Sequence, residues 1–117
     1  MIFAVIAARV YQKIFDMKKI ALFASGNGSN AENIITYFSE KNNVEVALIL
    51  TNNANAYVVE RAKNHHIPCL VFPSKELKET DFVLDKLCEY HIDFIVLAGF
   101  LLMIPKKIID RYPGKII

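Results

Sequence analysis

A short run of glycine, serine and asparagine carries the clearest chemical signal in this sequence. Residues 25–30 read Ser-Gly-Asn-Gly-Ser-Asn, between an apolar stretch at 20–24 and a segment whose apolar residues recur at helical spacing. A strand, a glycine turn and a helix start in that order leave main-chain N–H groups unpaired and open to a ligand. Anions, most often phosphate, bind in such places. The run therefore predicts a phosphorylated small molecule as the ligand.

The same turn also fits a dinucleotide-binding module, which is a second hypothesis for the function. Its spacing is Gly26-x-Gly28-x-x-Ala31, as in the dinucleotide fingerprint. That fingerprint requires an Asp or Glu about 20 residues further on to bind the ribose hydroxyls. The chain has Thr51-Asn52-Asn53 there, which disfavours NAD. A nucleoside-triphosphate loop is disfavoured as well, because no Lys-Ser/Thr pair follows the glycines.

The helix start can also be explained without any ligand. Ser29 and Glu32 have the spacing of a capping box, which would stabilise the helix by about 1 kcal/mol. A cap and a phosphate can share one helix end, so the two explanations are compatible. The capping box does not explain the two glycines or the neighbouring Asn27 and Asn30. We therefore favour phosphate binding.

Composition limits the class of protein. The 117 residues suit one domain, with a net charge of +2 and 54% hydrophobic residues. Residues 1–19 carry a charge of +3 and the remainder −1, which is no footprint for nucleic acid. The hydrophobic share is high for so short a domain and fits a sheet that packs against further protein.

The cysteines and the first residues bear on cellular location. Cys69 and Cys88 form neither a secreted disulfide framework nor a metal site, so we expect reduced thiols in a cytoplasmic protein without metal. The apolar start lacks a basic leader, and Arg9 interrupts it too early for a membrane span. We expect residues 1–16 to be an extension outside the domain, and residues 17–117 to form the domain.

Apolar runs and amphipathic segments alternate along the domain. Strands are expected at 20–24, 44–51, 69–72 and 93–98, with a further strand beginning at 115–117. Helices are expected at 29–41, 55–64, 80–90 and 105–112. This alternation predicts an α/β fold with a Rossmann-like, doubly wound parallel sheet, truncated after about four strands. Ligands of such sheets bind beyond the carboxyl ends of the strands.

Three segments, in order and at matching spacing, resemble the phosphoribosylglycinamide formyltransferases of de novo purine synthesis. They are 25–30, then 51–62 with its TNNANA and ERA runs, then Leu97-Ala98-Gly99-Phe100 with Ile104. The resemblance covers Lys18 to Ile117, about the first half of that family's usual length. The related methionyl-tRNA formyltransferases carry a different first turn. The resemblance implies transfer of a formyl group from formyltetrahydrofolate, as cosubstrate, to the amine of phosphoribosylglycinamide.

The resemblance also implies where the two ligands bind. The substrate phosphate would be held by Gly28, Ser29 and Asn30. The folate, bound largely through main-chain groups, would lie along Phe100, Leu101, Leu102, Met103 and Ile104. Many members of the family have Arg in place of Leu102, which costs a charge near the folate. Some also place a basic residue before the third helix, and Lys78 is only near that position. Taken singly, Leu97 and Phe100 are expected to be ordinary core residues.

The catalytic residues of the family have no counterpart in the 117 residues. Its Asn-x-His-Pro-Ser motif and a later Asp would lie beyond Ile117. His65, His66 and His91 do not replace them, because each stands at the end of an expected helix with no nucleophile or paired carboxylate nearby in sequence. We expect them to be solvated. The chain is thus expected to be an inactive amino-terminal part, or an inert fragment needing a partner. An exposed sheet edge at 93–98 would favour self-association.

Overall fold

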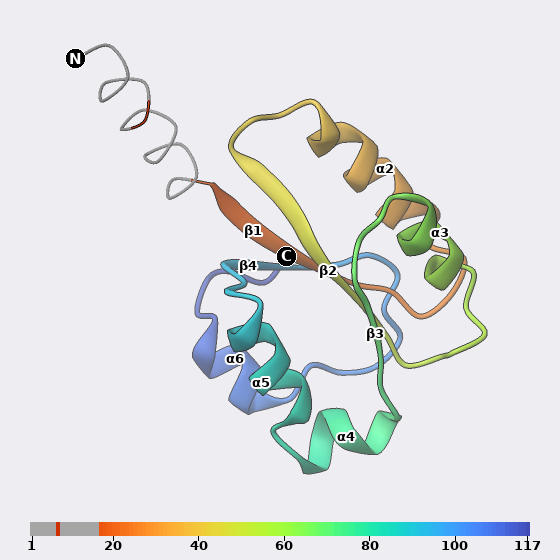
Figure 1. Ribbon diagram of the computed structural model, residues 1–117. Coiled ribbons are helices and arrows are strands. Elements are labelled where there is room, and N and C mark those ends of the chain that lie inside the picture. Colours follow the sequence, from red (N-terminus) through yellow and green to blue (C-terminus); the bar gives the residue numbers. More distant parts are fainter. Residues whose placement is uncertain (1–6, 8–16) are drawn as a thin grey trace.

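One parallel sheet organises the fold. The computed structural model describes residue 7 and residues 17–117 (Figure 1). Four strands lie in the order β3-β2-β1-β4, and every pair is parallel. Their bounds are β1 Lys18–Phe23, β2 Val44–Thr51, β3 Cys69–Val71 and β4 Phe94–Leu97. The expected α/β, doubly wound sheet is therefore confirmed.

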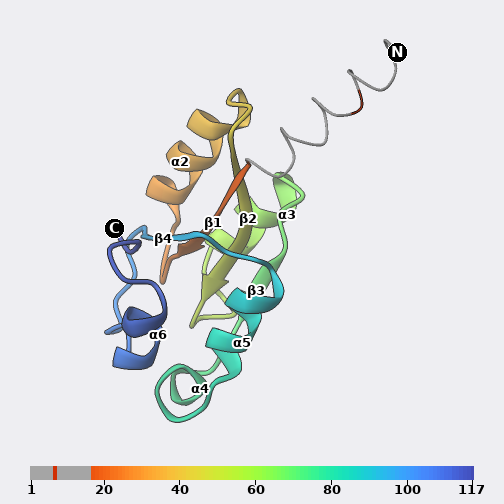
Figure 2. The ribbon, with the colours of Figure 1, turned by 90° about the vertical axis from the view of Figure 1, so that its left-hand side faces the viewer.

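Helices cover both faces of this sheet (Figures 1 and 2). One face packs against α2 (Ser29–Ser39) and α3 (Val58–Asn64). The other packs against α4 (Ser74–Glu79), α5 (Phe82–Glu89) and α6 (Lys106–Arg111). None of the helices in the described residues is long and apolar enough to cross a membrane.

The central strand β1 shows why the strands lack an alternating pattern. Leu22 points into the core beneath α2 and α3, whereas Ala21 and Phe23 point into the core beneath α4, α5 and α6. All three are fully buried. Both faces of the strand are covered, so each position favours an apolar residue.

The four expected helices are each two or three residues shorter than predicted, and two of the differences have a visible cause. The helix expected at 80–90 is α5 alone, and α4 precedes it as a separate helix that the sequence reasoning missed. Thr80 separates them: its main chain is extended, and its hydroxyl donates to the Glu76 carbonyl and accepts from the Phe82 N–H. The helix expected at 55–64 begins at Val58, because Asn53 first forms a turn with the Asn55 and Ala56 N–H groups.

The C-terminal residues extend the sheet beyond β4. The Ile95 N–H donates to the Lys115 carbonyl and the Ile117 N–H donates to the Ile95 carbonyl, each at 2.9 Å. A single parallel bridge between Ile95 and Ile116 thus stands where the further strand was expected to begin, at 115–117. The expectation that 93–98 would be the exposed sheet edge is wrong, because residues 115–117 form the outermost main chain on that side.

Candidate functional site

The order of the strands defines where a ligand crevice should lie. The chain moves from β1 outward to β2 and β3, then returns to β4 on the other side of β1. The connections after β1 and β4 therefore leave the sheet in opposite directions and open a crevice between them. The glycine turn at 25–28 follows β1, and the segment 98–105 follows β4. The two segments expected to bind ligands thus lie at this switch point.

The turn and the helix start after it hold main-chain N–H groups without an acceptor among the described residues, at buried Gly28 and at the two residues that follow. Gly28 has a left-handed conformation (φ 79°) and is the N-cap of α2, and the Glu32 N–H donates to its carbonyl at 2.8 Å. Within residues 17–117, no acceptor takes the N–H groups of Gly28, Ser29 or Asn30. Ser29 and Asn30 are exposed. The helix start can therefore donate several hydrogen bonds to an anion.

The expected capping box is wrong. Ser29 is the first helical residue rather than the N-cap, and no side chain caps α2. Glu32 instead turns toward α3, where its Oε1 accepts from Arg61 Nη1 at 3.1 Å and its Oε2 lies 2.5 Å from His65 Nε2. The Glu32 carboxylate therefore bonds to Arg61 and His65 and not to the main chain at the start of α2.

Glu32 also shows that His65 is not a solvated residue. The His65 side chain is about one-third exposed and bonded to the carboxylate. The hydrogen bond from His65 lowers the pKa of Glu32 below its ordinary value of 4.5, against an opposing effect of desolvation and with further help from Arg61. His66 and His91 have positive φ angles and terminate α3 and α5, where such conformations are common.

Arg61 joins α3 to the glycine turn, a contact that the sequence reasoning missed. Its Nε donates to the Asn27 carbonyl at 2.8 Å and its Nη2 to Asn27 Oδ1 at 2.7 Å. The Val58 N–H donates to the Gly26 carbonyl at 3.3 Å. The only sequence signal was the Glu60-Arg61-Ala62 run among the resembling segments.

Ser25 ties together the ends of three strands. Its hydroxyl donates to Asn52 Oδ1 at 2.8 Å and accepts from the Leu101 N–H at 2.9 Å. Its own N–H donates to the Gly99 carbonyl at 3.2 Å. The side chain is buried, so these bonds fix the two sides of the crevice relative to each other. Asn52, near the place where a dinucleotide-binding protein would carry its acidic residue, is engaged in this network.

The segment after β4 alternates between half-buried and exposed side chains. The Phe100 ring packs edge-on against Phe23, with centroids 5.1 Å apart, as a core residue would. Leu101 and Met103 are 84% and 91% exposed, whereas Leu102 and Ile104 are half-buried. Leu97, expected in the core, is 37% exposed. The segment therefore forms a wall with two exposed apolar side chains.

A hollow of about 590 Å³ lies beside this wall. Its lining includes Leu102, Met103 and Ile104 from the wall, and Lys78 and Lys106 from α4 and α6. Lys78, only loosely placed by sequence, thus shares a cavity with three of the residues expected to bind folate. The volume and the mainly apolar lining suit an organic cosubstrate.

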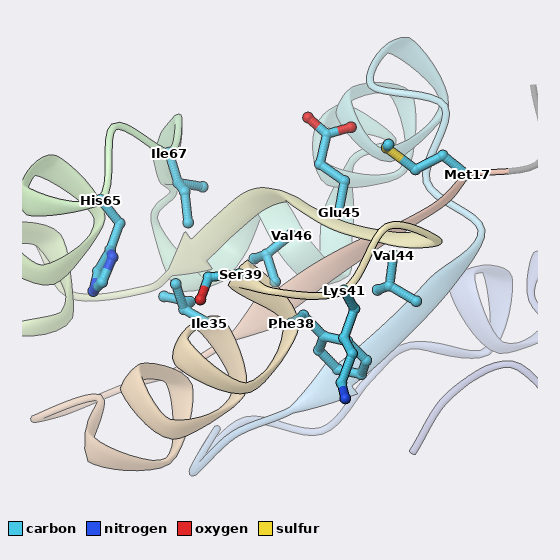
Figure 3. A pocket seen from close by; sticks show the side chains of 10 residues that line it. All are labelled: Met17, Ile35, Phe38, Ser39, Lys41, Val44, Glu45, Val46, His65 and Ile67. Atoms are coloured by element: carbon cyan, nitrogen blue, oxygen red, sulfur yellow. The ribbon is translucent and has the colours of Figure 1, made fainter. Parts of the chain in front are cut away.

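A second hollow lies elsewhere, between the end of α2 and the start of β2 (Figure 3). Its volume is about 400 Å³, and its lining includes Phe38, Val44 and Ile67 with Lys41 and Glu45. None of the candidate phosphate or folate residues lines it. This second hollow is therefore separate from the candidate site.

The described histidine, cysteine and carboxylate side chains do not gather into a cluster. No group of three or more His, Cys, Asp and Glu side chains there could hold a metal ion. Cys69 and Cys88 are free thiols, and burial raises the pKa of Cys69. The candidate site is thus made of main-chain donors, a polar network and an apolar wall.

Comparison with known proteins agrees with this geometry. The sequence model described as formyl transferase matches residues 18–117. A phosphoribosylglycinamide formyltransferase of Bacillus subtilis (strain 168) is 38% identical over 106 residues, covering 86% of this chain and 54% of the relative. A chloroplastic phosphoribosylglycinamide formyltransferase of Arabidopsis thaliana is 36% identical, covering 86% of this chain and 36% of the relative.

Solved structures show the same relation. Glycinamide ribonucleotide transformylase 1 from Geobacillus kaustophilus superposes with a TM-score of 0.79 at 33% identity, over 86% of this chain and 56% of that one. The chain thus spans about half the length of the bacterial relative and of this structure. With its family match over residues 18–117, this chain belongs to the formyl transferase family.

Proposed function

We propose that this chain takes part in the transfer of a formyl group from formyltetrahydrofolate to the amine of phosphoribosylglycinamide. The observation that carries the proposal is the glycine turn, whose free N–H groups lie at the switch point of the sheet, beside an apolar wall. An anion site and an organic-ligand site at one crevice suit a phosphorylated substrate and a folate cosubstrate. The two relatives are named as phosphoribosylglycinamide formyltransferases, which supports the proposed substrate and the transferred group.

In this proposal the substrate phosphate binds at the start of α2. The N–H groups of Gly28, Ser29 and Asn30, with the exposed Ser29 hydroxyl, would donate to its oxygens. Hydrogen bonds to a charged group are worth about 1.5–3 kcal/mol each. The phosphate thus supplies much of the binding and fixes the position of the substrate amine.

The folate would occupy the hollow beside residues 100–104. Leu102 and Ile104 line it, and Lys78 would supply the positive charge that family members with Arg have at position 102. Lys106 also lines the hollow, but its ammonium is paired with Asp110 at 2.7 Å. The Leu101 N–H already donates to Ser25, so the pterin would use other main-chain groups of the segment. The hydrogen bond from Leu101 holds this wall in place for the cosubstrate.

Formyl transfer also needs proton chemistry. The substrate amine attacks the formyl carbon and forms a tetrahedral oxyanion that must be stabilised. The amine then loses a proton, and the bond from the formyl carbon to the folate nitrogen breaks as that nitrogen takes up a proton. The family resemblance assigns those tasks to an Asn, a His and an Asp beyond position 117. We therefore propose that residues 17–117 position both ligands, and that the 117-residue polypeptide binds them without transferring the formyl group.

Calorimetry tests the proposed substrate. The 117-residue chain should bind phosphoribosylglycinamide, and the dephosphorylated riboside should bind at least about tenfold more weakly because the charged hydrogen bonds are lost. Equal affinity for the two compounds would contradict the phosphate site. Tight binding of NAD in the same titration would favour the alternative, a dinucleotide-binding module. An absence of binding by all three would leave the inert-fragment hypothesis.

We also propose that the chain self-associates through its outer sheet edge. The main chain of residues 115–117 is outermost, and the Leu97 and Ile117 side chains are 37% and 78% exposed. Light scattering should show a mass that rises with concentration, and Ile117→Lys should reduce the rise because charge blunts an edge. A monomer at every concentration would contradict this.

We also propose that the protein is located in the cytoplasm.

A further inference from the structure

We infer that Arg61 is a positioning residue for the glycine turn, which leads into the proposed phosphate site. The inference rests on the proposed phosphate role of residues 28–30. Arg61 would hold the main chain of these residues in the shape that binds the phosphate. Arg61 would act through Asn27 rather than by contact with the substrate.

Arg61 holds Asn27 through two hydrogen bonds. The guanidinium donates from Nε to the Asn27 carbonyl and from Nη2 to Asn27 Oδ1, at 2.8 and 2.7 Å. One planar group thus holds both the main chain and the side chain of a single residue, the one that precedes Gly28. Two bonds from a rigid fork fix orientation as well as distance.

Arg61 is itself held in place. Nη1 donates to Glu32 Oε1 at 3.1 Å, and the other oxygen of Glu32 lies 2.5 Å from His65 Nε2. The guanidinium carbon also lies 4.8 Å from the centre of the Tyr57 ring. The Arg61 side chain is only 20% exposed. Contacts on several sides leave it one orientation, so the turn meets a rigid support.

Most of the hydrogen-bond donors of Arg61 are already engaged. Three of the five N–H groups of Arg61 face Asn27 and Glu32, and Glu32 offsets its charge. The free donors at the helix start are main-chain groups of residues 28–30. The arrangement suits a support behind the turn, with the main chain as the surface that meets the phosphate. Lysine would lack the planar fork needed for these contacts.

The test compares Arg61→Met and Arg61→Lys with Lys63→Met in the full 117-residue chain. Lys63 lies on the same helix, carries the same charge, and pairs only with Glu60 at 3.7 Å among the residues described. Ribose 5-phosphate is titrated at low and at high salt, and amide relaxation of Gly28 and Ser29 is recorded by NMR without ligand. Thermal unfolding shows that each variant is folded.

We expect Arg61→Met to weaken ribose 5-phosphate binding about tenfold or more, at both salt concentrations, and to increase the mobility of Gly28 and Ser29. Arg61→Lys should recover little, and Lys63→Met should stay within about twofold of the wild type. Should Arg61→Met fail to fold, Arg61→Lys keeps the charge and most of the stem and carries the same comparison.

Three results would overturn the inference. They are wild-type affinity and turn mobility in both Arg61 variants, a loss that disappears at high salt, or full recovery by lysine. The second and third would mean that Arg61 acts only through its charge. If the wild type binds no ribose 5-phosphate while the Arg61 variants loosen the turn, the proposed function fails and the positioning role of Arg61 stands.

Discussion

Gly28 lies directly against Val58, the first residue of α3. A β-carbon at position 28 would stand 2.7 Å from Val58 Cγ2 and 2.8 Å from Val58 Cβ. The left-handed conformation of Gly28 adds a second reason for glycine. The close approach of α3 to the turn therefore depends on a residue without a side chain.

Gly28→Ala should therefore destabilise the whole domain. Left-handed strain costs about 1–2 kcal/mol and the overlap with Val58 adds to it, so the melting temperature should fall by about 5 °C or more. Gly26→Ala is the matched control, since nothing lies within 4 Å of a β-carbon there. Thermal unfolding of both variants checks this, and an equal effect of the two would contradict the packing argument. A Gly28 variant that binds ligand more weakly is therefore compared with the wild type at a temperature where both are folded.

Ser29→Ala separates binding from stability. The Ser29 side chain makes no capping bond, so the melting temperature should change by less than about 2 °C. Phosphate-ester binding should weaken by about 1.5–3 kcal/mol, because one hydrogen bond to a charged group is lost. Calorimetry and thermal unfolding of the same sample measure both quantities. A clear loss of stability with unchanged affinity would restore the capping box and remove Ser29 from the phosphate site.

The pair between Glu32 and His65 predicts a dependence of stability on pH. Because the pKa of Glu32 is lowered in the folded chain, its contribution is present above about pH 4.5 and is lost as the pH falls through the lowered value. Glu32→Gln should therefore lose less stability than the wild type between about pH 5 and pH 3. Glu60→Gln is the control, as the Glu60 side chain is 55% exposed. Parallel pH profiles for the wild type and Glu32→Gln would contradict the prediction.

Of residues 1–16, the structure describes residue 7 alone, so their assignment as an extension is still a prediction. A chain that begins at Met17 should keep the melting temperature of the full chain within about 2 °C, because the family match starts at residue 18. Differential scanning calorimetry of the two chains measures this. A loss of several degrees in the shorter chain would show that residues 1–16 pack on the domain.

The sheet and the ligand turn could be predicted because local sequence determines them. Apolar runs such as Val44–Thr51 leave few alternatives to a buried strand, and Gly28 marks a place where the main chain must turn. The order of elements then fixes the carboxyl edge as the site. α4 was missed because its six residues contain one buried apolar residue, Leu77, and show no helical repeat.

The contacts that hold the glycine turn and the start of α2 against α3 could not be predicted, because they join residues that are distant in sequence. Serine and glycine are both good N-caps, and the choice of Gly28 depends on Val58, which is distant in sequence. Glu32 had a local partner in Ser29 and instead bonds to Arg61 and His65. A single sequence gives no measure of which of these competing contacts is stronger.

The central claim is that the start of α2 binds the substrate phosphate. An NMR titration of the isotope-labelled 117-residue chain with phosphoribosylglycinamide tests it most directly, because each main-chain N–H reports separately. We predict the largest amide shifts at Gly28, Ser29 and Asn30, and little change at Lys41 and Val44, which line the hollow in Figure 3. Shifts confined to that hollow, or none at residues 28–30, would contradict the claim.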